Sequence, residues 1–318
     1  MKKENVSKED DLSLDYDKDF VVDKDYRASL PDMQNASVKA IRGAHVPISR
    51  VGSSNFKLPL KFKTPTGETM TLETSISAAV SVGGESKGIN MSRIVRTVYE
   101  YQYEVMSISS LPTIVDALAK ALNSDHVWIK LNFSYPIIQK SLRSGLEGYQ
   151  YYTCAFEGIL DKGQPLKQIF YFDYVYSSSC PCSSELSKHA REERNIYSIP
   201  HSQRSTARVK VQVADNTELF VEDLLSLCVK GIPTETQVMV RREDEQAFAE
   251  LNGANLIFVE DAIRLLFREL DADKRIVDFE IACAHLESLH SHDAVSVTAK
   301  GIPGGFNGTF TDFQSLVR

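Results

Sequence analysis

The chain has 318 residues, of which 42% are hydrophobic and 25% are charged, and its net charge is −7. This length can bury a large core, and the composition is that of a globular protein. The negative balance argues against an extended nucleic-acid surface. Because the chain also lacks a membrane-length apolar run and an apolar signal core, we expect a cytoplasmic protein without membrane or nucleic-acid partners.

The first half of the chain alternates strand patterns with helix patterns. Residues 1–28 are dense in Asp, Glu and Lys, so we predict a flexible charged tail, with order beginning near Leu30. Apolar alternation and β-branched or aromatic runs predict strands at 56–62, 70–82, 127–138, 148–160 and 168–177. Helical spacing predicts helices at 91–105 and 111–122.

The second half repeats this theme. It predicts strands at 206–214, 275–288 and 294–301 and helices at 217–231, 244–252 and 258–270. We therefore predict an α+β fold of two fused modules, 29–180 and 181–318, each with helices over one face of an antiparallel sheet.

Two glycine-rich stretches do not qualify as nucleotide loops. GGESKGINMS lacks the Gly-Lys-Ser/Thr ending that places a lysine on phosphates. GIPGGFNG follows a strand but opens no helix, so it does not support a dinucleotide fold. Both stretches are predicted to be turns.

Five cysteines in a chain without an export signal are more typical of buried, metal-bound or reactive thiols than of disulfides. Cys154, Cys228 and Cys283 lie within apolar patterns and are predicted core residues. Cys180 and Cys182 differ, because Pro, Ser and Glu surround them at the end of an aromatic strand. They are therefore candidates for chemistry.

A second polar cluster is AHLESLHSHDA, which contains His285, Glu287, His290 and His292. Histidine titrates near neutral pH, so such a cluster can bind metal or move protons. Two further groups of acidic residues, Glu243 to Glu245 and Glu260 with Asp261, are explained by their positions in the first turns of predicted helices, where negative charge is favoured. Together the clusters are compatible with a mixed Cys/His/Glu metal site that leaves a position open for water.

Six segments, in chain order, carry a family resemblance: LPDMQ, GINMSR, SCPCSSELS, HSQRS, DEQAFAELNGANLIFVEDAIR and HLESLHSHDA. From about Leu30 to the C-terminus the chain resembles type IB GTP cyclohydrolase I. The resemblance implies a bimodular tunnelling fold assembled into a homotetramer with sites at subunit interfaces. It also implies the conversion of GTP and water to 7,8-dihydroneopterin triphosphate and formate, the first step toward tetrahydrofolate.

The resemblance also assigns residues. It implies a divalent metal ion (zinc, manganese or iron) on Cys180, His201 and Glu245, with a loop bringing the first two together. Glu260 matches the residue that anchors the guanine edge. The remaining expected site residues are Glu287, His290 and His292 as proton shuttles and Lys188, Arg204, Ser205 and Arg242 toward the substrate.

The chain departs from the family between Cys180 and His201, where KHAREERNIYS lengthens the segment and His189 becomes a rival ligand. The match of Gln203-Arg204-Ser205 favours His201, with His189 at the surface. Two other hypotheses about the function remain: a tunnelling-fold nitrile reductase with a cysteine nucleophile, and a non-catalytic protein stabilised by structural metal.

Overall fold

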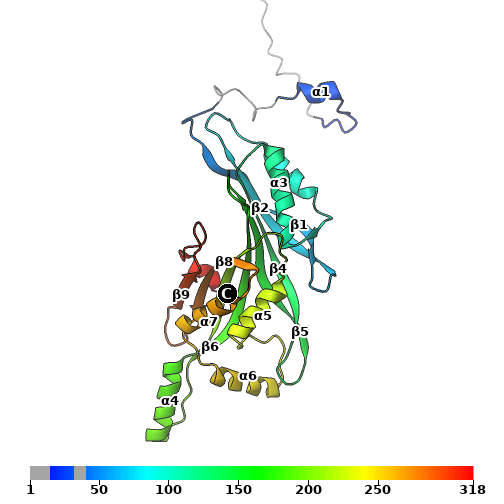
Figure 1. Ribbon diagram of the computed structural model, residues 1–318. Coiled ribbons are helices and arrows are strands. Elements are labelled where there is room, and N and C mark those ends of the chain that lie inside the picture. Colours follow the sequence, from blue (N-terminus) through cyan, green and yellow to red (C-terminus); the bar gives the residue numbers. More distant parts are fainter. Residues whose placement is uncertain (1–14, 32–40, 318) are drawn as a thin grey trace, which may run out of the picture.

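A single nine-stranded sheet organises the chain, in the order β3-β1-β2-β4-β5-β6-β7-β8-β9 (Figure 1). The computed structural model describes residues 15–31 and 41–317. The strands are β1 (Ile48–Lys63), β2 (Thr69–Val82), β3 (Val105–Met106), β4 (Val127–Lys140), β5 (Glu147–Leu160), β6 (Lys167–Ser179), β7 (Ser202–Val213), β8 (Ile276–His285) and β9 (Ala294–Ala299). Only β1 and β3 pair in parallel within this sheet.

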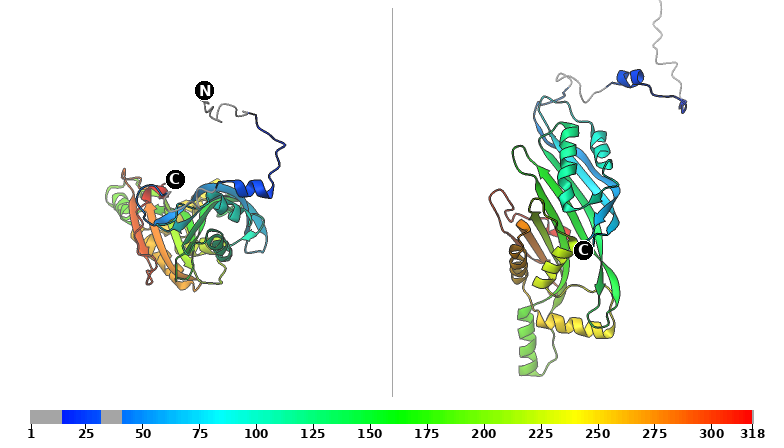
Figure 2. Two further views of the ribbon diagram at one scale, coloured as in Figure 1. Left: turned by 90° about the horizontal axis from the view of Figure 1, so that it is seen from above. Right: turned by 45° about the vertical axis from the view of Figure 1, so that its right-hand side comes forward.

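Helices cover one face of this sheet (Figure 2). The α-helices are α1 (Lys24–Ser29), α2 (Met91–Tyr99), α3 (Leu111–Leu122), α4 (Pro181–Arg194), α5 (Val221–Gly231), α6 (Arg242–Ala254) and α7 (Val259–Ala272), with short 3₁₀ helices η2 (Ile108–Ser110) and η3 (Phe313–Leu316). α3 packs on β4 and β5, α5 on β6, and α7 on β8 and β9, whereas α4 projects from the body (Figure 1). Within the described ranges, no helix has the length and apolar character needed to cross a membrane.

The core lies between the sheet and these helices. Phe170, Phe172, Tyr174 and Tyr176 alternate along β6 and are completely buried. This alternation places every second side chain of the strand on the helix-covered face. The predicted core positions of Cys154, Cys228 and Cys283 are confirmed, because all three are buried.

The opposite face of the sheet carries charged pairs and the C-terminal segment. Arg208 contacts both carboxylate oxygens of Asp173 at 2.8 Å, and η3 packs on β7 and β8 there. The GIPGGFNG stretch is a turn, as predicted. Buried Asp278 accepts hydrogen bonds from the backbone N–H groups of Gly301 at 2.9 Å and Phe306 at 2.6 Å, which fixes that turn against β8.

Most predicted elements are confirmed, although several of their ends differ: α5 begins at Val221 and β1 already at Ile48. The helix predicted over 91–105 ends at Tyr99. The segment after Cys180, expected to be a loop, begins as the 14-residue helix α4, because Pro181 occupies its first turn and Asn195 ends it in the left-handed conformation.

The expected module boundary at residue 180 does not divide the sheet. β6 and β7 lie on either side of it and pair continuously from Ile169 with Gln212 to Ser179 with Ser202.

The predicted charged tail, 1–28, and the LPDMQ motif lie partly outside the described residues. Within the described part, α1 is exposed.

Candidate functional site

A pocket of about 410 Å³ lies where the ends of β6, β7 and β8 meet the N-terminus of α7. Four separate segments of the chain contribute to it. Its lining consists of Cys180, Cys182, His201, Gln203, Ile257, Phe258, Val259, Glu260, His285, Glu287, Leu289, His290, His292 and Ala294. The pocket therefore combines both polar clusters identified from the sequence.

Cys180 is held at the junction of β6 and α4. Its backbone N–H donates to the carbonyl of His201 at 3.2 Å, and its Sγ accepts from the backbone N–H of Ser183 at 3.5 Å. The thiol is thus the N-cap of α4, and its neighbour Cys182 is exposed in the first turn. These contacts bring Cys180 and His201 to the same pocket.

His201 precedes β7 and is held on both its backbone and its ring. Its backbone N–H donates to Ser183 Oγ at 3.2 Å. Its Nδ1 lies 3.0 Å from Gln203 Oε1 and 3.4 Å from Glu287 Oε2. The His201 and Glu287 side chains are only 16% and 14% exposed, so this contact is largely shielded from water.

Glu260 and two histidines line the outer part of the pocket. Glu260 is in the first turn of α7, where backbone N–H groups favour a negative charge. The rings of His290 and His292 stack with centroids 4.8 Å apart and planes 11° apart. The predicted acidic and histidine residues are therefore brought together here.

Other predicted site residues lie elsewhere in the chain. Glu245, Arg242 and Lys188 are exposed on α6 and α4 and do not line the pocket. Arg204 is exposed, while Ser205 is completely buried.

The N-terminus of α6, which carries Glu245, is tied to the β4–β5 turn. Buried Asp244 accepts from the backbone N–H groups of Arg143 at 2.8 Å, Ser144 at 2.9 Å and Arg241 at 2.8 Å. This fixes the place of Glu245 away from Cys180 and His201. Accordingly, the described part of the chain contains no group of three or more His, Cys, Asp or Glu residues that could hold a metal ion.

His285, a member of the predicted histidine cluster, and Gln203, to which the sequence assigns no role, both line the pocket. His285 is 2% exposed, and its Nε2 lies 2.9 Å from the hydroxyl of Tyr176. Burial lowers its pKa from 6.5 to about 4, so this imidazole is neutral at neutral pH. Residues two apart along a strand point to the same face. This spacing relates His285 to Glu287 and Gln203 to His201, and it is the sequence signal that could place them in one pocket.

His189, the rival ligand, is exposed on α4, as predicted.

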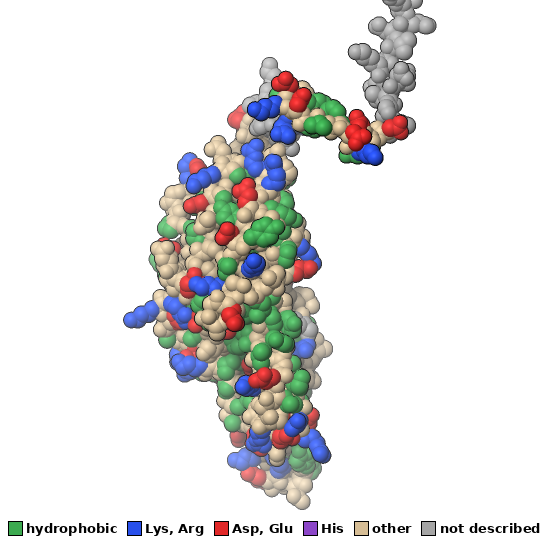
Figure 3. All heavy atoms as spheres, turned by 90° about the vertical axis from the view of Figure 1, so that its right-hand side faces the viewer, with side chains coloured by type: hydrophobic (Ala, Val, Ile, Leu, Met, Phe, Trp, Pro, Cys, Tyr) green, Lys and Arg blue, Asp and Glu red, His purple; other side chains and the backbone are tan. Residues whose placement is uncertain are grey.

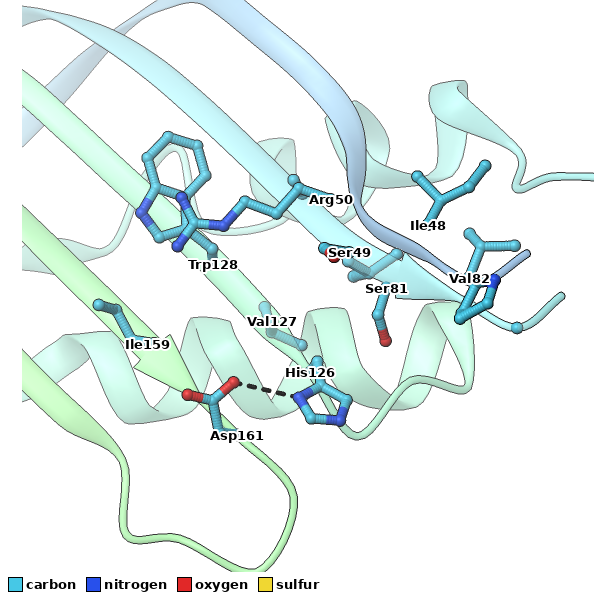
Figure 4. Close-up of a pocket in the computed structure, with 14 residues that line it drawn as sticks. Ile48, Ser49, Arg50, Ser81, Val82, His126, Val127, Trp128, Ile159 and Asp161 are labelled. Atoms are coloured by element: carbon cyan, nitrogen blue, oxygen red, sulfur yellow. Dashed lines mark hydrogen bonds and ion pairs between the residues drawn. The ribbon is translucent and has the colours of Figure 1, made fainter. Parts of the chain in front are cut away.

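A different pocket, of about 420 Å³, lies at the far end of the sheet (Figure 4). There Arg50 lies over the Trp128 ring at 4.9 Å, and His126 pairs with Asp161 at 3.1 Å. It contains no cysteine and none of the predicted site residues.

Comparison of structures defines the fold class. A thermostable mutant of a uricase superposes with a TM-score of 0.51 at 7% sequence identity, covering 84% of this chain and 96% of that one. The protein is therefore of mixed α+β, uricase-like fold, with a cysteine, histidine and carboxylate pocket at the end of its sheet.

Comparison of sequences defines the family. The family model described as type I GTP cyclohydrolase FolE2 matches residues 30–296. The GTP cyclohydrolase FolE2 of Ruegeria pomeroyi is 54% identical over 92% of this chain and 79% of its own length. That of Roseobacter denitrificans is 52% identical over 91% and 79%. The chain belongs to the FolE2 family of type I GTP cyclohydrolases.

Proposed function

We propose that this protein is a GTP cyclohydrolase of type IB, which converts GTP and water to 7,8-dihydroneopterin triphosphate and formate at the start of tetrahydrofolate synthesis. The observation that carries this proposal is the convergence of Cys180, His201, Glu260 and Glu287 on one pocket in a FolE2 family chain. The tunnelling-fold division into two modules, 29–180 and 181–318, is part of the same proposal.

Catalysis is proposed to need a divalent metal ion held by Cys180, His201 and Glu245. Thiolate, imidazole and carboxylate together suit zinc, manganese or iron. Within one chain, only the first two ligands reach the pocket, so Glu245 is proposed to come from a second copy. When bound, the ion would supply Lewis-acid activation of water.

This arrangement requires a homo-oligomer, proposed to be a tetramer with its sites between subunits. Hydrophobic side chains gather on the lower half of one face (Figure 3). The exposed ones on β4, on β5 and just before α6 are Ile138, Tyr149, Tyr151, Val238, Met239 and Val240. Apolar patches of this kind are typical of protein–protein contacts, and this one adjoins the helix that carries Glu245.

Glu260 is proposed to recognise guanine. Its two carboxylate oxygens can accept hydrogen bonds from guanine N1–H and the 2-amino group. Adenine does not offer these two donors, so binding ATP would leave the carboxylate unpaired. Glu287, His290 and His292 lie in the same pocket and are proposed to transfer the protons that ring opening and reclosure require.

Cations are needed for the triphosphate. Lys188, Arg204 and Arg242 are proposed for this role, from the same or neighbouring copies. Ser205 is left out, because its buried hydroxyl contacts Ser178 Oγ at 2.8 Å.

The test is incubation of metal-reconstituted protein with GTP in the absence of NADPH, following formate and pterin absorbance. Cys180→Ala is expected to lose bound metal and formate release, whereas its matched control Cys182→Ala retains both. Loss of turnover in Cys180→Ala with full metal content would instead favour a cysteine nucleophile. Bound metal without any turnover in the unmodified protein would indicate a purely structural ion.

The shared site has its own test by subunit mixing. Cys180→Ala and Glu245→Ala chains should each be inactive alone. Co-assembled oligomers should regain activity, because some sites combine an intact Cys180 from one chain with an intact Glu245 from another. If mixing restores nothing although mixed oligomers form, the two residues do not act in one site across two chains.

A further inference from the structure

The ring of His201 is the first member of a hydrogen-bonded chain that runs into the sheet. Its Nδ1 lies 3.0 Å from Gln203 Oε1, and Gln203 Nε2 donates to Ser178 Oγ at 2.6 Å. Ser178 Oγ in turn lies 2.8 Å from Ser205 Oγ. Ser178 and Ser205 are completely buried, and Gln203 is 9% exposed.

Strand geometry explains this chain. Gln203 and Ser205 are two residues apart on β7 and therefore share a face, and Ser178 on β6 is directly opposite Gln203. His201 continues the same spacing immediately before the strand. The HSQRS segment thus supplies three of the four members.

The contact with Glu287 indicates the direction of the hydrogen bonds. An amide can present either its oxygen or its NH₂ group to a histidine nitrogen. However, Glu287 Oε2 also faces Nδ1, at 3.4 Å, and an ionised carboxylate only accepts hydrogen bonds. Nδ1 therefore carries the proton, the oxygen of Gln203 accepts from it, and the NH₂ group of Gln203 donates to Ser178.

We propose that Gln203 is a positioning residue that, through Ser178 and Ser205, holds His201 in the tautomer with a proton on Nδ1 and the lone pair on Nε2. The use of that lone pair rests on the proposed function, in which His201 binds the metal ion. The tautomer itself does not depend on it. Partners that hold the other nitrogen of a metal-binding histidine set its tautomer and its ring orientation.

NMR of ¹⁵N-histidine-labelled, metal-free protein tests the tautomer directly, because protonated and unprotonated ring nitrogens have well-separated shifts. The spectrum is recorded above the ordinary titration range of histidine, and His201→Gln identifies the signals. The unmodified protein is expected to show Nδ1 protonated and Nε2 unprotonated. Gln203→Leu removes the nearer acceptor, at 3.0 Å, and leaves only the Glu287 contact at 3.4 Å, so it should give a mixture of tautomers.

Three further variants separate positioning from general packing. Gln203→Glu keeps an acceptor for Nδ1 and should preserve the tautomer. Ser178→Ala, which leaves the Gln203 acceptor in place but removes its anchor, should mix the tautomers partially. Gln212→Leu, on the other face of the same strand, should change nothing. An unchanged His201 tautomer in both folded Gln203→Leu and Ser178→Ala would overturn the proposal.

Measuring zinc affinity in the Gln203 variants distinguishes a failure of this positioning role from a failure of the proposed function. Gln203→Leu should weaken zinc binding by about 10–100-fold in a chelator competition, with Gln203→Glu restoring most of it. If the tautomer shifts in Gln203→Leu while zinc affinity stays the same, the positioning role stands and the metal role of His201 fails.

Discussion

His285 makes the stability of this protein depend on pH in a defined window. Its imidazole is 2% exposed, and burial lowers its pKa from 6.5 to about 4. In the unfolded chain the same ring takes up a proton at its ordinary pKa. Between these values the unfolded state binds more protons, so stability is fully present above the unfolded pKa and is lost as pH falls toward 4.

The size of the effect follows from the two pKa values. Linkage gives a loss of about 2 kcal/mol at about pH 5, rising to about 3 kcal/mol at about pH 4. His285→Gln retains an acceptor for the Tyr176 hydroxyl but does not titrate. Because this substitution also changes the packing around residue 285, the quantity to compare is how the stability difference between parent and variant changes with pH.

Urea unfolding at about pH 7.5 and about pH 5, at one protein concentration, measures that change. The difference in stability between parent and variant should shift by about 2 kcal/mol in favour of His285→Gln at the lower pH. His126→Gln is the matched control, because it makes the same substitution at a side chain that is 46% exposed. A parallel pH dependence of parent and His285→Gln would refute the claim that His285 is buried in its neutral form.

Three further substitutions test the site and its supports. Glu260→Gln should reduce kcat/KM for GTP by the equivalent of about 2–4 kcal/mol while metal content is retained, and unchanged kinetics would remove Glu260 from base recognition. Asp278→Ala leaves two backbone N–H groups of the C-terminal turn without their acceptor, so residues 300–317 should be cleaved faster in limited proteolysis; an unaltered rate would show that other contacts hold the segment. Asp244→Ala should speed hydrogen exchange at the β4–β5 turn without affecting exchange in β7, and equal protection would mean that the turn is held by other groups.

Strands and most helices could be predicted because their burial is periodic. Alternation along β4 and aromatic residues along β6 mark strands in the sequence itself. α4 has no such signal, since Ser187 is its only buried residue, and its start depends on Cys180 and Pro181 as cap and first-turn residues. The continuity of the sheet across residue 180 depends on the pairing of β6 with β7 on either side of α4, which local patterns do not encode.

The site was predictable to a similar degree. Cys180 is a candidate because polar residues surround it in the sequence, whereas His201 is assigned by the match of the HSQRS motif. Gln203 resembles an ordinary strand residue, and only the fold reveals that its side chain reaches the pocket. For Glu245 the situation is reversed. A motif assigns it to the site, but within one chain it is exposed on α6 and does not line the pocket.

The order of the strands has a consequence for how the chain is made. If the short β3, which pairs in parallel with β1, is set aside, neighbouring strands of the described sheet follow one another in sequence. A nascent chain can therefore add each strand to an edge that already exists, without inserting one between two others. We expect the sheet to form from its N-terminal strands onward during synthesis. β9 then pairs with β8, and the C-terminal segment packs on the sheet, after release from the ribosome. Ribosome-bound chains ending after β6 should then already protect β1, β2, β4 and β5 from proteolysis, and lack of protection at that length would show that β7 and β8 are needed first.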